Sequence, residues 1–119
     1  MQNEVEMTRY LLAKPGTTID YPFGPEVRVF KVMGKVFALF DPAQAPLKIN
    51  LKCDPIQAQA LRDMFPAIKP GYHMNKKHWN TITLDGSVPE GEIQRLCDHS
   101  FELVVKGLPK AKRPALRAD

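Results

Sequence analysis

The chain has 119 residues, of which 44% are hydrophobic and 25% charged, and its 17 lysines and arginines against 13 acids give a net charge of +4. This composition is ordinary for one soluble globular domain, and it excludes a disordered chain and a collagen-like repeat. No apolar run approaches the roughly 20 residues that a membrane-spanning helix needs, so we expect no membrane partner.

A helix is predicted over residues 4–14. Its apolar residues lie four or seven positions apart, which gathers them toward one side of a helix with 3.6 residues per turn. They are Val5, Met7, Leu11 and Leu12. Residues 17–25 are expected to form a loop, because two prolines and a glycine interrupt them.

Three strands are expected next, at residues 27–32, 35–40 and 47–52. The first two are rich in β-branched and aromatic residues, and Gly34 can take the positive φ that a two-residue hairpin turn requires. In the third strand, apolar residues alternate with polar ones, so one face of the strand is polar. That polar face carries Lys48, Asn50 and Lys52.

A second helix is predicted from Asp54-Pro55 to Pro66, because Asp54 can cap free amides and Pro55 fits the first helical position. We expect its buried stripe to be Ile56, Ala60, Leu61 and Met64. A short strand broken by Pro70 and a strand at residues 79–84 follow. The longest helix is predicted over residues 89–106. The apolar residues that recur on it and just beyond it are Ile93, Leu96, Cys97, Phe101, Val104 and Leu108.

This order of elements predicts an α+β fold in two layers, an antiparallel sheet with helices on one face. We expect a single domain at residues 1–108, a basic C-terminal tail at residues 109–119, and a monomer. The charge is uneven: residues 27–84 carry a net charge of +6, whereas residues 85–105 carry −4. The positive charge therefore belongs to the sheet region, and the last helix is acidic.

Residues 72–80 mix cations, amides and aromatic rings. Lys76 and Lys77 could neutralise phosphates, and Asn75, His78 and Asn80 could make closer contacts. The alternative is a solvated loop, with Trp79 as a packing residue of the core. Lysines on the strands could extend this surface, or they could simply protect the sheet from aggregation. They are Lys31, Lys35, Lys48 and Lys52.

Cys53 and Cys97 are interpreted as reduced thiols, which favours a cytoplasmic location. His73 and His78 are five positions apart, and no zinc-binding spacing occurs in the sequence. We therefore expect no metal, no cofactor and no catalytic residue. An enzymatic or small-molecule role built on His73, His78 and Trp79 has the weakest support.

Three segments resemble the MmcQ/YjbR family of small bacterial proteins: residues 22–40, 47–55 and 71–93. The most specific part is His73–Asn80, which is followed after a short strand by Asp85-Gly86, and the similarity extends from about Leu11 to Arg113. The resemblance implies an α-β(3)-α-β(2)-α two-layer fold, like that of CyaY-like and secretion-chaperone-like domains. It also implies DNA binding, which is attached to the family because two strand-loop wings resemble those of winged DNA-binding proteins.

The sequence therefore predicts a non-enzymatic protein that binds double-stranded DNA. The expected nucleic-acid-binding residues are Lys48, Lys52, Asn75, Lys76, Lys77, His78 and Asn80. The alternative is a protein-interaction module in which the sheet face or an edge strand receives a partner peptide. Salt would separate the two, because phosphate contacts make affinity strongly salt-dependent.

Overall fold

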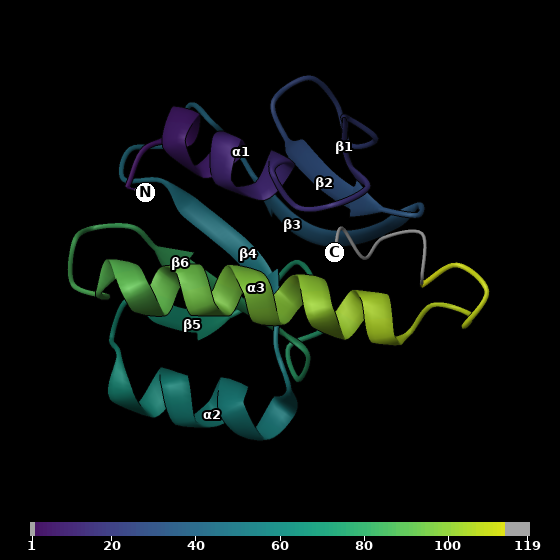
Figure 1. The fold of residues 1–119 in the computed structure, drawn as a ribbon. Coiled ribbons are helices and arrows are strands. Elements are labelled where there is room, and N and C mark those ends of the chain that lie inside the picture. The colour runs from purple at the N-terminus through teal and green to yellow at the C-terminus, as the bar shows by residue number, and fades with distance from the viewer. Residues whose placement is uncertain (1, 114–119) are drawn as a thin grey trace.

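The computed structural model describes residues 2–113, and within them a six-stranded antiparallel sheet packs against helices (Figure 1). The helices are α1 (Glu4–Leu12), α2 (Pro55–Met64) and α3 (Glu90–Lys106). The strands are β1 (Thr17–Asp20), β2 (Arg28–Val32), β3 (Lys35–Phe40), β4 (Lys48–Lys52), β5 (Ile68–Pro70) and β6 (Trp79–Thr83). The order across the sheet is β1-β2-β3-β4-β6-β5.

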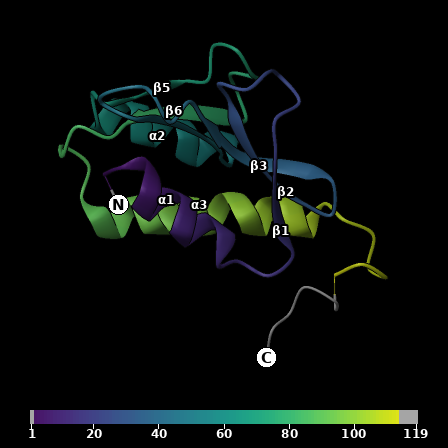
Figure 2. The ribbon, with the colours of Figure 1, turned by 90° about the horizontal axis from the view of Figure 1, so that it is seen from above.

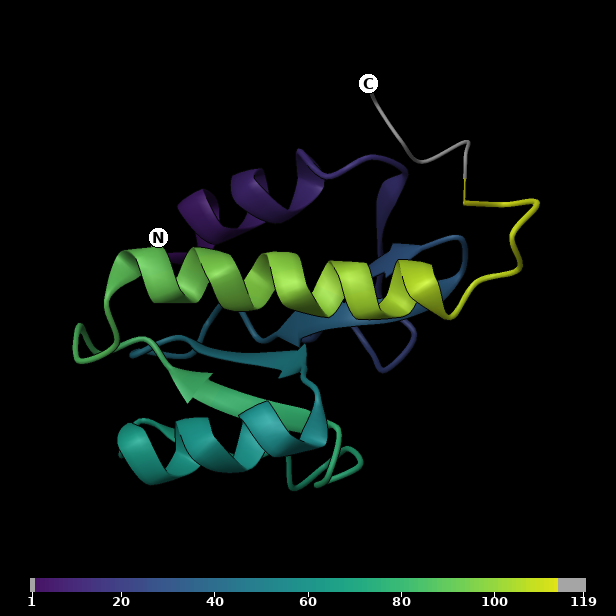
Figure 3. The same cartoon turned by 60° about the horizontal axis from the view of Figure 1, so that its bottom comes forward.

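The two faces of the sheet differ in what covers them. On one face, a large buried cluster joins strand residues to all three helices, including Leu11 of α1, Leu61 of α2 and Leu96 of α3. Figures 2 and 3 show α3 lying beside α1 along this face. The buried cluster on the opposite face is small, and its residues come from strands: Val29, Leu39 and Trp79. We call this second face the open face.

The fold class predicted from the sequence is confirmed, with one added strand. Residues 17–20 were expected to belong to a loop, but they form β1, which pairs with β2 in the register Ile19↔Phe30. Thr17, Thr18 and Ile19 favour extended backbone, and the first proline of this region comes only at position 22. The hairpin between β2 and β3 is confirmed, with positive φ at both Met33 (50°) and Gly34 (79°).

The buried stripe predicted for α3 is confirmed, because Ile93, Leu96 and Val104 are buried. The residue between them, Phe101, is partly buried and meets the ring of Phe37 edge to face at 5.2 Å. The long helix therefore packs across strands β2, β3 and β4 with one apolar side against them.

The predicted stripes of the two shorter helices are partly wrong. On α1, Met7 and Leu11 are buried, but Val5 and Leu12 are exposed. On α2, Leu61 is buried, whereas the other members of the predicted stripe are exposed: Ile56, Ala60 and Met64. The correct partner of Leu61 on the buried side is Ala58, three residues earlier. A small residue at that position lets α2 pack closely on β5 and β6.

Residues 109–113 of the expected C-terminal tail follow α3, and residues 114–119 lie outside the described residues. Arg113 folds back on the helix end, where its Nε donates a hydrogen bond to the Leu108 carbonyl oxygen at 2.9 Å. No helix within residues 2–113 has the length and apolarity to cross a membrane.

Candidate functional site

Residues 71–78, between β5 and β6, form two consecutive turns; we call them loop 71–78. Met74 N donates to the Gly71 carbonyl oxygen at 2.9 Å, and His78 N donates to the Asn75 carbonyl oxygen at 3.2 Å. The Asn75 side-chain oxygen accepts a further hydrogen bond from Lys77 N at 2.9 Å. Position 71 must be glycine, because a Cβ atom there would lie 2.9 Å from the Cβ of Trp79. The loop therefore has a defined shape and lies close against β6.

Arg62 of α2 holds this loop from the helical layer. Its Nε donates to the Asn80 side-chain oxygen at 2.7 Å, and its guanidinium also donates to the Lys76 carbonyl oxygen. The Asn80 amide nitrogen lies 3.5 Å from the Ala58 carbonyl oxygen. Arg62 thus joins the second helix, strand β6 and loop 71–78.

Asn80, for which a contact with nucleic acid was expected, does not lie at the surface. Asn80 is only 2% exposed, and it pairs with Leu51, so its side chain points into the helical layer beneath α2. Strand alternation explains this position, since Asn80 lies two residues before the buried Ile82. That spacing was visible in the sequence and is the signal that identifies Asn80 as a structural residue.

The other predicted residues of this segment lie at the surface. Asn75, Lys76, Lys77 and His78 are all exposed on loop 71–78. The Lys76 ammonium lies 5.3 Å from the centroid of the Tyr72 ring. Trp79, in contrast, is 8% exposed and packs with Val29 and Leu39 beneath the loop. It therefore supports the loop and is not available for stacking on a base.

Strand β4 does present Lys48 and Lys52 on the open face, but the two lie at opposite ends of the strand. Four residues in a strand span about 13 Å. Lys48 lines a hollow together with Lys69 of β5, whereas Lys52 lines a separate hollow with Lys35 near the end of α3. Lys31, also on the open face, forms an ion pair with Asp20 at 2.8 Å. The four expected lysines therefore do not form one continuous row.

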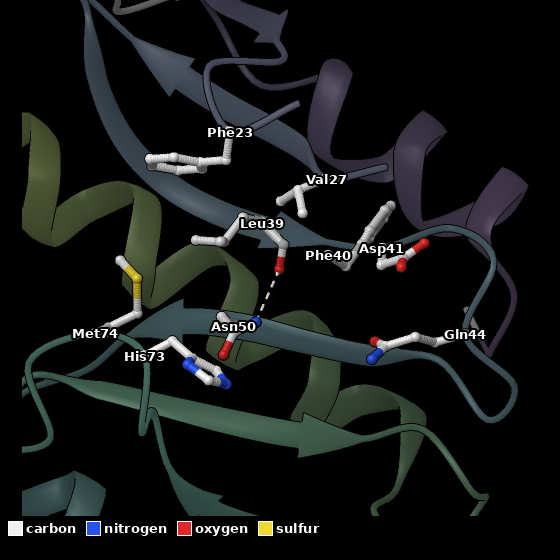
Figure 4. Close-up of a pocket in the computed structure, with 9 residues that line it drawn as sticks. All are labelled: Phe23, Val27, Leu39, Phe40, Asp41, Gln44, Asn50, His73 and Met74. Atoms are coloured by element: carbon white, nitrogen blue, oxygen red, sulfur yellow. Dashed lines mark hydrogen bonds between the residues drawn. The ribbon is translucent and has the colours of Figure 1, made fainter. Parts of the chain in front are cut away.

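The open face carries a hollow of about 400 Å³ that the sequence did not predict (Figure 4). Its walls come from loop 71–78, strands β3 and β4, and the segment before β2; they include Phe23, Leu39, Asn50 and Met74. The Lys48 hollow, of about 290 Å³, adjoins it, because Gln44, Asn50 and His73 line both. We call the two together the trough. Its residues come from five separate parts of the chain, so only the fold brings them together.

The thiols offer no activated nucleophile. Burial raises the pKa of Cys53 to about 11 and that of Cys97 to about 12, so both remain protonated at neutral pH. Within residues 2–113 no group of three histidine, cysteine or acidic side chains is arranged to hold a metal ion.

The fold and this surface define a class: a small α+β domain with helices on one face of an antiparallel sheet and a basic, hollowed open face. Residues 12–103 match the YjbR family model, and the chain belongs to the YjbR family. This confirms the resemblance found in the sequence.

Two relatives from Escherichia coli cover most of the chain. YbdF of strain O157:H7 is 40% identical over 109 residues, which are 92% of this chain and 89% of YbdF. YjbR of strain K12 is 34% identical over 111 residues, 93% of this chain and 94% of YjbR. Both relatives are named as uncharacterised proteins. They therefore support the family assignment but indicate no activity.

Two solved structures are similar to this fold. DR2400 of Deinococcus radiodurans, a DUF419 domain, superposes with a TM-score of 0.92 at 41% identity, covering 98% of this chain and 88% of DR2400. A Pseudomonas syringae protein superposes with a TM-score of 0.73 at 32% identity, covering 85% of this chain and 97% of that one.

Proposed function

We propose that this protein is a non-enzymatic, DNA-binding protein whose open face and loop 71–78 contact phosphates. The observation that carries the proposal is a group of lysines on this side of the molecule. Among residues 2–113, no carboxylate forms an ion pair with any of them. They are Lys48, Lys69, Lys76 and Lys77.

Several basic residues on the helical side of the molecule are neutralised by ion pairs instead. Arg28 binds Glu4 at 2.8 Å, Arg95 binds Glu92 at 2.7 Å, and Lys14 binds Asp98. The acids of α3 lie in the helical layer, on the other side of the sheet, so they do not neutralise the open face. A modest net charge thus conceals a local positive field, which attracts polyanions.

Lysine suits this role because its ammonium group attracts a phosphate as a point charge. Such a contact does not distinguish one base sequence from another. Each phosphate that is neutralised releases condensed counterions, which makes binding depend steeply on salt. We therefore expect DNA binding with little sequence preference. The buried, protonated thiols support a role without covalent catalysis.

The test is fluorescence anisotropy with a labelled DNA duplex and with one of its strands, measured over a series of salt concentrations. Replacing Lys76 and Lys77 by alanine should weaken binding to unrelated duplexes by similar factors. The slope of log K against log salt should flatten by about 2, since each lost phosphate contact contributes roughly 0.9.

The matched control is the double variant Lys110→Ala and Lys112→Ala, which removes the same charge from exposed residues after α3. It should bind like the wild type. Equal affinity and slope in the Lys76/Lys77 variant would contradict the assignment of the loop. Absence of binding to either DNA at low salt would contradict the proposed function and favour the peptide-binding alternative.

A further inference from the structure

The trough has the size and continuity of a binding site for a small group. Its two hollows, of about 400 and 290 Å³, are joined through the shared side chains of Gln44, Asn50 and His73. Small-molecule sites in proteins have volumes of roughly 300–1,000 Å³. The combined space is too small for a duplex but large enough for one nucleotide unit.

The two ends of the trough differ in chemistry. The larger hollow is lined mainly by apolar side chains, among them Phe23, Leu39 and Met74. The smaller one is lined by Lys48 and Lys69, with the hydroxyl groups of Tyr72, Thr81 and Thr83 around them. The carboxylate of Asp41 lines only the larger hollow. An anionic ligand is therefore oriented with its charge at the lysine end and its apolar part at the other end.

Asn50 lies where the two hollows meet, and its amide is held in place. The Thr81 hydroxyl donates to the Asn50 side-chain oxygen at 2.6 Å, while the amide nitrogen makes a long contact of 3.4 Å with the Leu39 carbonyl oxygen (Figure 4). An amide nitrogen carries two N–H donors. At least one of them is free for an acceptor on a ligand in the larger hollow.

Phe23 supplies an aromatic surface at the apolar end. Its side chain is 64% exposed, which is unusual for a phenylalanine. Pro22 and Pro25 on either side restrict the backbone, and the Arg28 Nε donates to the Tyr21 hydroxyl oxygen at 3.0 Å beside it. Because the backbone of this segment is already restrained, stacking a base on Phe23 would cost the protein little additional conformational entropy.

We propose that the trough binds one unpaired nucleotide, with its base beside Phe23, Asn50 and Met74 and its phosphate at Lys48 and Lys69. The proposal rests on the proposed function and deepens it, because it makes single-stranded nucleic acid the preferred partner. A base within a duplex is stacked and paired, so neither its face nor its edge can enter the trough. An unpaired base offers a flat face to an aromatic ring and acceptors to an amide.

The test compares Phe23→Ala with the wild type on a labelled single-stranded oligonucleotide and on the duplex that contains it. Loss of one base-stacking surface should weaken single-strand binding roughly 5- to 150-fold. Duplex binding should not change, because it uses phosphate contacts alone. Ile56→Ala is the matched control, since Ile56 is 83% exposed on α2, away from the trough. Thermal unfolding checks that both variants remain folded.

A second measurement uses a free nucleoside 5′-monophosphate and backbone amide NMR. Binding should shift the signals of Gln44, Asn50, Lys69 and His73, and Phe23→Ala should reduce these shifts. Shifts confined to other residues would overturn the inference. So would single-strand binding that is no tighter than duplex binding, or that is insensitive to Phe23→Ala, although the proposed function would then stand. If neither DNA binds at low salt, both proposals are wrong.

Discussion

Arg62 is the residue that connects helix α2 to loop 71–78. Its two hydrogen bonds, to the Asn80 side chain and to the Lys76 carbonyl oxygen, cross from the helical layer to the edge of the open face. Asn80 is buried, so its side-chain oxygen depends on a donor from the protein. Arg62 therefore acts on the candidate site by fixing the shape of the loop.

Replacing Arg62 by alanine should lower the free energy of unfolding by about 1–3 kcal/mol, the cost of a buried acceptor left without a partner. Urea denaturation measures this change. Arg9→Ala is the control, because Arg9 is exposed on α1 and surface changes usually stay within about 0.5 kcal/mol. Equal effects of the two substitutions would show that Arg62 contributes only as a surface charge.

His99 links stability to pH. Its Nε2 accepts a hydrogen bond from Asp54 N at 3.2 Å, which requires the unprotonated ring. Burial, followed by the charge of Arg95, lowers the pKa of His99 below its ordinary value. The unfolded chain then binds more protons than the folded one at pH values between the folded pKa and about 6.5. Stability is fully present above this range and is lost as the pH falls through it.

The expected result is a free energy of unfolding that declines as the pH falls below about 6.5 in the wild type. In His99→Gln the decline should be smaller, because the glutamine oxygen can accept the same hydrogen bond and does not titrate in this range. Chemical denaturation at a series of pH values makes the comparison. An identical pH dependence in both proteins would mean that His99 is not responsible.

Among the elements, α2 shows why a helix can be predicted without its orientation. Ile56, Ala60 and Met64 repeat every four residues, and Ala58 and Leu61 lie three apart. Both spacings fit a helical period, so the sequence alone does not choose between them. The short strand β5 decides the outcome, because α2 lies at the edge of the sheet and buries only a narrow side. Helix α3 packs across strands β2, β3 and β4, and its longer apolar stripe allowed a correct prediction.

The orientation of α2 can be checked by substitution on its two sides. Leu61→Ala should cost about 2–5 kcal/mol of stability, the usual loss for a buried leucine. Ile56→Ala should change stability by less than about 0.5 kcal/mol, because Ile56 is exposed. Equilibrium urea unfolding distinguishes the two. A large effect at Ile56 would restore the stripe that the sequence predicted.

At the scale of the whole molecule, the two-layer fold places the acidic helix α3 and the lysines of the open face on opposite sides of the sheet. The strand alternation predicted the polar face of β4 and therefore Lys48, and the polar loop predicted Lys76 and Lys77 as surface residues. Lys69 was missed because β5 has only three residues and ends at Pro70. The trough could not be predicted, since Phe23, Gln44, Asn50 and His73 are brought together only by tertiary packing.

Nucleic-acid binding could depend on the positive electrostatic field of the whole molecule or on specific contacts in the trough. Two pairs of lysines distinguish the two cases, because Lys48 and Lys69 line the trough on the open face whereas Lys35 and Lys52 line a separate hollow at the end of α3. Replacing either pair by alanine removes the same net charge. If binding depended only on the general electrostatic field, both double substitutions would therefore weaken it equally.

We expect Lys48→Ala with Lys69→Ala to weaken single-strand binding more than Lys35→Ala with Lys52→Ala. The first variant should also flatten the slope of log K against log salt by about 1.4, since each phosphate contact to a single strand contributes roughly 0.7. The second variant should keep the slope of the wild type. Anisotropy titrations over a salt series give both quantities. Equal losses of affinity and slope in the two variants would mean that the general positive charge of the molecule, and not the trough, holds the strand.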